Sequence, residues 1–201
     1  MTLANEKSSK SKQAAIMAMT ASLYSVFFLL SFSVTLPGFT LLYLPIILLG
    51  VFPLWFGWSG LVGSMVGGFV GGALVEGLGF LGVFESVVAL LIYMINWILI
   101  PKGAAEDGKT KNLVALLGVY TLSLFVGTSY ILWQYTVLPQ LFTGTKALAI
   151  LVTTFGLNLP IVLVACPALI RAISPRLRSW GVYSGNLREW IINRNKAKKQ
   201  D

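Results

Sequence analysis

The 201-residue chain contains no histidine, only one cysteine and few charged residues. Without histidine, and with Cys166 alone, it lacks the ligand set of most familiar metal sites and the histidine base of many hydrolases. It also lacks a Walker-type phosphate loop, a Gly-x-Ser-x-Gly nucleophile elbow and any zinc motif. We therefore predict a protein that is not an enzyme, carries no cofactor and cannot hydrolyse ATP by itself.

Charged residues make up 11 % of the chain, whereas hydrophobic residues make up 56 %. A soluble domain carries about 25 % charged residues, and about 20 consecutive apolar residues cross the hydrocarbon core of a bilayer. The apolar runs here are continuous rather than alternating, which favours helices over a barrel. We predict an all-α integral membrane protein with six transmembrane helices, over residues 14–34, 39–55, 58–76, 83–100, 113–134 and 146–171.

The basic residues indicate which side of the membrane each segment occupies. Of the 15 lysines and arginines, Lys7, Lys10 and Lys12 precede the first run, Lys102, Lys109 and Lys111 lie between the fourth and fifth, and all others except Lys146 lie from Arg171 onward. Cytoplasmic loops carry the lysine and arginine excess, so six spans with both termini in the cytoplasm satisfy the pattern, whereas five do not. The net charge of +8 sits in these flanks, where we expect membrane lipids, and no nucleic acid, as partners.

The polar ends of the chain frame a single membrane domain. We predict a disordered cytoplasmic N-terminus over residues 1–12, a six-helix membrane domain over 13–175 and a basic cytoplasmic tail over 176–201. In the tail, Leu187, Trp190 and Ile191 recur at helical spacing among basic residues, which predicts an amphipathic interfacial helix on the inner leaflet. Trp55 and Trp58 are expected at the inner membrane interface, as in aromatic belts.

Small residues recur at four-residue spacing in two of the runs, where another helix can approach closely. Ala14 and Ala18 share one face of the first run, and this face serves either an internal neighbour or a partner protein. Gly63, Gly67 and Gly71 form a GxxxGxxxG row in the third run. That row either packs helices within one bundle or provides a dimerisation or sliding surface.

Two acidic residues, Glu76 and Glu85, lie within or beside the apolar runs. A charge at the bilayer centre costs roughly 3 kcal/mol, so such residues mark functional sites. Glu76 closes the third run and is expected to reach the outer headgroup region. Glu85 precedes a continuous apolar stretch, which makes it the stronger candidate for a site role.

Further polar and aromatic side chains are expected at the depth of Glu85. They are Tyr130, Trp133 and Gln134 in the fifth run and Asn158 in the sixth. Each of them alone is more typical of a helix–helix hydrogen bond than of a ligand contact. Together they predict an outward-facing pocket with one carboxylate, an aromatic pair and an amide. Such a pocket suits a small cationic or aromatic molecule, through charge pairing and cation–π attraction.

Four stretches of the chain follow a known pattern. They are Ala14-x-x-x-Ala18, Leu44–Leu49 leading into Gly60–Gly72, Phe84-Glu85, and Trp133-Gln134-Tyr135 with Asn158. In these stretches the chain resembles the substrate-binding S components of energy-coupling factor (ECF) vitamin transporters. The resemblance implies six helices, a transmembrane T component that docks on the Ala14–Ala18 face, and cytoplasmic ATPase subunits that supply energy. It also implies that the whole protein topples in the membrane during transport.

The last two stretches look most like the thiamine-specific branch of this family. The resemblance implies that Glu85 pairs with a cationic ring, that Trp133 stacks on it and that Asn158 hydrogen-bonds to it. The expected function is substrate capture for vitamin uptake at the cell membrane. Two alternatives remain: a membrane sensor or scaffold that docks partners through its basic tail, and a lipid-directed enzyme that uses Glu76 and Glu85 as a pair.

Overall fold

The computed structural model is almost entirely helical and describes residues 2–32, 35–36, 39–40, 42–76, 80–103, 109–137 and 144–197. Its elements are α1 (Thr2–Phe32), β1 (Thr35–Leu36), β2 (Phe39–Thr40), α2 (Pro45–Glu76), α3 (Phe80–Leu99), α4 (Thr110–Val137), α5 (Gly144–Thr153), a π-helical turn (Thr154–Asn158), α6 (Leu159–Ser179) and α7 (Leu187–Ala197). The two short strands pair antiparallel, with Thr35 opposite Thr40. The helical fold class is confirmed apart from this strand pair.

Four helical segments of the described chain are long and apolar enough to cross a membrane. They are Lys10–Ser31, Pro45–Val75, Thr110–Trp133 and Leu148–Ser179, and α3 contributes a shorter apolar helix, Glu85–Leu99. These segments support the prediction of a membrane protein. Their number differs from the predicted six because the second and third predicted spans are joined in α2 and because the described apolar part of α3 is short.

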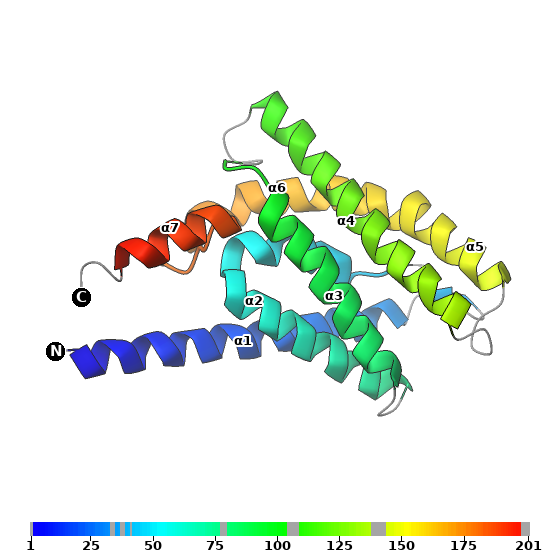
Figure 1. Ribbon diagram of the computed structural model, residues 1–201, viewed down its shortest axis with the longest axis horizontal. Helices are drawn as coiled ribbons and strands as arrows, with labels where there is room; N and C mark the ends of the chain where they lie inside the picture. The colour runs from blue at the N-terminus through cyan, green and yellow to red at the C-terminus, as the bar shows by residue number, and fades with distance from the viewer. Residues whose placement is uncertain are drawn as a thin grey trace.

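The helix α2 is broken at Gly57, whose backbone angles of φ 50° and ψ −128° are not helical. The arm of residues 45–56 and the arm of residues 58–76 therefore run in different directions, as the sharp turn of the cyan ribbon in Figure 1 shows. Glycine adopts such a conformation at little steric cost because it has no Cβ. The break falls between the predicted runs 39–55 and 58–76.

The chain between α6 and α7 caps the first arm of α2. The backbone N–H groups of Ser184 and Gly185 donate to the carbonyl oxygens of Trp55 (3.0 Å) and Leu54 (2.9 Å). The indole N–H of Trp97 in α3 donates to the carbonyl of Gly185 at 3.1 Å. The last carbonyls of a helix have no partner within it, so these bonds stabilise the break. This segment, which lies beyond the boundary predicted at residue 175, thus packs against α2 and α3.

Polar side chains of α3 satisfy further carbonyls near the break. The Tyr93 hydroxyl donates to the Gly57 carbonyl at 2.6 Å. Pro53 has no N–H, so it cannot bond the carbonyl of Leu49 four residues earlier. The side-chain amide of Asn96 donates to that carbonyl instead, at 3.0 Å. Proline and glycine therefore set the shape of α2, and α3 supplies the hydrogen bonds that this shape requires.

The glycine row of α2 lies against α1. A Cβ at Gly63 would overlap the side chain of Thr20, and a Cβ at Gly67 would lie 2.6 Å from the carbonyl oxygen of Ala21. All three glycines of the row, Gly71 included, are buried. The row therefore lies at an internal helix–helix contact, where the absence of side chains lets the two backbones approach closely.

The structure differs from two further predictions, one at the start of the chain and one in α2. We predicted disorder for residues 1–12, whereas α1 begins at Thr2. This segment includes Ala4, Glu6 and Lys7, residue types that favour helices. Trp55 was expected at the membrane interface, but it is 6 % exposed and donates to the Ser174 hydroxyl at 3.0 Å.

The predicted C-terminal helix is present as α7. Asn186 and Glu189 form a capping box at its start, since each side chain accepts a hydrogen bond from the backbone N–H of the other, at 2.9 and 3.3 Å. Trp190 packs edge-on against Trp97, with ring centroids 5.5 Å apart. Ile191 stays 44 % exposed. Figure 1 shows both ends of the chain at the same end of the molecule, and the C-terminal end of α4 at the other.

Candidate functional site

Glu85 and Asn158, which come from different helices, both hydrogen-bond to Tyr43, the residue shortly before α2. The Tyr43 hydroxyl donates to Glu85 Oε2 at 3.1 Å. The backbone N–H of Tyr43 donates to Asn158 Oδ1 at 2.8 Å. The structure therefore brings two of the predicted site residues together through a third residue that the sequence did not single out.

The helix α1 adds an aromatic wall to this cluster. The hydroxyls of Tyr24 and Tyr43 lie 2.8 Å apart. Tyr43 has one hydroxyl proton, which it donates to Glu85, so Tyr24 acts as the donor to Tyr43. The Phe28 ring meets the Tyr43 ring edge-on, with centroids 6.0 Å apart, and Tyr24 and Phe28 are almost completely buried.

Asn158 occupies the last position of the π-helical turn between α5 and α6. Its amide nitrogen donates to the carbonyl of Thr153 at 3.1 Å, and its side chain is 3 % exposed. Pro160, two residues further along, lacks the N–H that a regular helix would use. Both ends of the buried amide are hydrogen-bonded, so Asn158 joins the segment before α2 to the irregular turn. Single π-helical turns inside α-helices are frequent at functional sites.

Tyr130 and Trp133 lie together near the end of α4. Their ring centroids are 5.9 Å apart, Tyr130 is partly buried and Trp133 is 54 % exposed. Gly127 of α4 sits against Ile92 of α3, and the two helices run antiparallel (Figure 1). Six residues beyond Gly127 and seven before Ile92 are displacements of about 10 Å each at 1.5 Å per residue. Trp133 is therefore close in level to Glu85.

The remaining predicted residues are placed differently. The side chains of Gln134 and Glu76 lie outside the described part of the structure. Ala14 and Ala18 are both exposed, so none of the described helices covers this face of α1. Two roles were predicted for this face, contact with a helix of the same chain and contact with a partner protein. The described residues do not show the first of these contacts.

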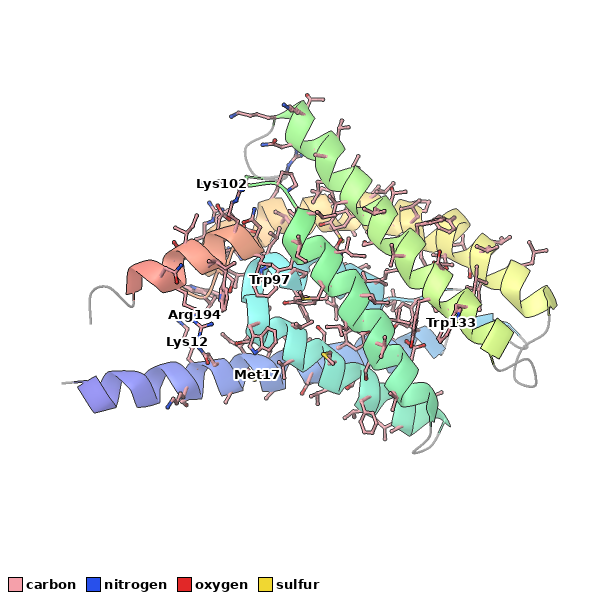
Figure 2. All side chains as sticks on the ribbon, viewed as in Figure 1. Lys12, Met17, Trp97, Lys102, Trp133 and Arg194 are labelled. Atoms are coloured by element: carbon pink, nitrogen blue, oxygen red, sulfur yellow. The ribbon has the colours of Figure 1, made fainter. Side chains whose placement is uncertain are left out.

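Two grooves flank α7 at the end of the molecule where the chain begins and ends. One has a volume of about 770 Å³ and is lined in part by Lys102 and Glu189, which lie 3.9 Å apart. The other has a volume of about 760 Å³, and Lys12, Trp58 and Arg194 contribute to its lining. Figure 2 places Lys12, Lys102 and Arg194 at this end of the molecule and Trp133 towards the other. Neither groove was predicted from the sequence. Tryptophans and basic residues that lie close together along the chain were the signal that could have indicated them.

Within the described residues, no three histidine, cysteine, aspartate or glutamate side chains lie close enough to hold a metal ion. No protein-family model, curated protein or solved structure matches this chain. The family resemblance of the sequence therefore stays a prediction.

Proposed function

We propose that this protein is the substrate-capture subunit of an ECF-type importer and binds a small, cationic or aromatic molecule such as a vitamin. The observation that carries the proposal is the meeting of Glu85 and Asn158 at Tyr43. A carboxylate, an amide and aromatic rings that come from separate elements of the chain are typical parts of a small-molecule site. The cluster lies among apolar helices. Ionisable side chains in such surroundings cost free energy, and they are usually found where a function requires them.

The proposed topology has six crossings, with both termini in the cytoplasm. In this topology α2 would make two crossings, on either side of the non-helical Gly57. Both ends of the chain lie at one end of the molecule (Figure 1). Residues 45–56 span about 18 Å, less than the hydrocarbon thickness of about 30 Å. The segment that contains Tyr43 would then complete the second crossing, in the outer half of the membrane.

The chemistry of the cluster favours a cation. The Tyr43 hydroxyl gives Glu85 a neutral hydrogen bond, which leaves the negative charge of the carboxylate in place to attract a ligand. Attraction between charges is much stronger at low dielectric than in water. The rings of Tyr130 and Trp133, close in level to Glu85, offer faces for cation–π contact or stacking.

Capture alone does not move a substrate inward, so the proposal includes partners. A transmembrane T component and cytoplasmic ATPases would supply the movement, because this chain has no nucleotide-binding loop of its own. The exposed Ala14–Ala18 face of α1 is the proposed docking surface, and helices pack closely where such small residues meet.

The test is a thermal-shift screen of the purified protein in detergent against vitamins and related metabolites. A ligand that binds only the folded state raises the melting temperature. We expect one compound to do so and Glu85→Gln to weaken its binding about tenfold or more, since a charge-assisted contact contributes about 1.5–3 kcal/mol.

Glu76→Gln is the matched control because it removes the same charge from the neighbouring helix, and it should leave the affinity unchanged. Equal losses in the two variants would contradict the assignment of Glu85. If no compound in a broad panel shifts the melting temperature, the sensor or scaffold function gains support, with the exposed face of α7 as the place where partners would bind.

A further inference from the structure

The groove between α1 and α7 combines basic and aromatic side chains that substrate capture does not use. Its walls come from several elements, and the lining includes Lys12, Ile16, Trp58, Met94, Trp190 and Arg194. Figure 2 labels Lys12 and Arg194 in the region between α1 and α7, and both line the same groove. The groove therefore lies between α1 and the C-terminal helix α7.

The charge of the groove is positive. Its described lining includes Lys12 and Arg194 but no aspartate or glutamate. The Lys12 ammonium donates to the carbonyl of Gly181 at 2.9 Å and to that of Trp180 at 3.5 Å. An ammonium has three N–H groups, so these contacts hold Lys12 in place and leave capacity for an anion. The Arg194 guanidinium lies 5.1 Å from the centroid of the Trp190 ring.

The depth of the groove corresponds to the ends of two candidate membrane spans. One span begins at Lys10 and another ends at Ser179, directly before the carbonyls that bind Lys12. A lysine or arginine at this depth meets the phosphate groups of the leaflet, and tryptophan is enriched there as well. A ligand at this position would approach from the membrane rather than from bulk water.

The groove also has an apolar part. Trp58 is 53 % exposed on its wall, and Ile16 and Met94 also line it. A cationic rim next to apolar walls matches a molecule with an anionic head and a hydrocarbon tail.

We propose that this groove binds an anionic phospholipid, with the headgroup between Lys12 and Arg194 and an acyl chain along Trp58 and Ile16. The lipid would bridge α1 and α7 and so fix the C-terminal helix on the membrane domain. The second groove is less suited to an anion, because the Glu189 carboxylate contributes to its lining. The site is separate from the Tyr43 cluster and does not depend on which molecule that cluster binds.

The experiment uses the full-length protein in neutral detergent, titrated with phosphatidylglycerol or phosphatidylcholine. We expect phosphatidylglycerol to raise the melting temperature at lower mole fractions than phosphatidylcholine. Each basic side chain near the membrane surface strengthens the attraction to an anionic headgroup. In Lys12→Gln/Arg194→Gln the half-saturating mole fraction of phosphatidylglycerol should therefore rise roughly tenfold or more.

The matched control is Lys10→Gln/Arg188→Gln, which removes the same charges from the same two helices at exposed positions outside the groove. It should keep the preference for phosphatidylglycerol, as should the charge-conserving Lys12→Arg/Arg194→Lys. If loss of the Lys12 contacts prevents folding, Arg194→Gln alone provides the test and should weaken the lipid preference severalfold.

Three results would overturn the proposal. Equal stabilisation by the two lipids would show that charge does not matter. A preference that survives in the folded groove variant would place the lipid elsewhere. An equal shift of the melting temperature with inorganic phosphate would indicate a site for soluble anions. A protein segment would then be the better candidate to cover the apolar wall of the groove.

Discussion

At the scale of single residues, Gly57 decides the course of α2. A side chain there would be strained by the positive φ of 50°, and its Cβ would lie 2.9 Å from the Ser184 hydroxyl and 3.1 Å from the Trp97 ring. The position therefore needs glycine for its backbone conformation and for the space that Ser184 occupies. The same residue thus turns the chain and lets the segment before α7 dock on the turn.

We expect Gly57→Ala to lower the free energy of unfolding by about 1–3 kcal/mol from backbone strain alone, with a further loss from the contacts with Ser184. Gly118→Ala is the control, because a Cβ at Gly118 in α4 meets no atom within 4 Å. Alanine favours the helix there by up to about 1 kcal/mol. Unfolding in mixed micelles measures both variants, and equal stabilities would contradict the role of Gly57.

Glu85 and Asn158 could be selected from the sequence because polar residues inside apolar runs are costly and therefore informative. Tyr43 and Tyr24 could not, since tyrosines in membrane segments are common and no spacing distinguishes these two. Their hydroxyls matter because of a contact between α1 and the segment before α2, which depends on how the chain folds back on itself. A functional site held together by such contacts is only partly visible in a linear pattern.

At the scale of elements, α1 has two faces with different neighbours. Thr20 and Ala21 contact the glycine row of α2, whereas Ala14 and Ala18 are exposed. Four-residue spacing predicted a close helix contact for the alanines and the glycines alike. It could not show which of them meet inside the chain, because spacing defines a face but not its neighbour.

We expect Ala14→Trp/Ala18→Trp to leave ligand binding intact and to abolish uptake by the assembled transporter, because the bulky rings block docking on α1. Met19→Trp/Leu23→Trp is the matched control, since these two residues are also four apart and exposed on α1. Uptake assays with the partner subunits compare the two variants. Normal uptake with tryptophan at 14 and 18, or loss with both pairs, would contradict this docking surface.

The C-terminal part of the chain shows what periodicity can and cannot predict. The spacing of Leu187 and Trp190 predicted α7 correctly as a helix. It gave no sign that Ser184 and Gly185 bond to the carbonyls of α2, because backbone hydrogen bonds over such separations leave no side-chain pattern. The boundary predicted at residue 175 was placed by charge, whereas the packing extends past it.

At the scale of the whole molecule, the question is whether α2 crosses the membrane once or twice. The basic residues near both termini and between α3 and α4 require an even number of crossings if all of them face the cytoplasm. A single crossing by α2 would give an odd number, with the termini on opposite sides. The proposed even number of crossings therefore depends on the reversal of the chain at Gly57. Labelling of introduced cysteines can distinguish one crossing by α2 from two.

We expect cysteines introduced one at a time at Lys10, Lys111 and Arg188, in a Cys166→Ser background, to react with an impermeant maleimide only after the cells are permeabilised. Trp133→Cys, at the other end of the molecule and 54 % exposed, should react in intact cells. With one crossing by α2, position 10 would lie on the side opposite to 111 and 188. Labelling of position 10 on one side, and of positions 111 and 188 on the other, would therefore exclude the second crossing. A shared side for all three would support two crossings by α2, because only a reversal within α2 gives an even number of crossings.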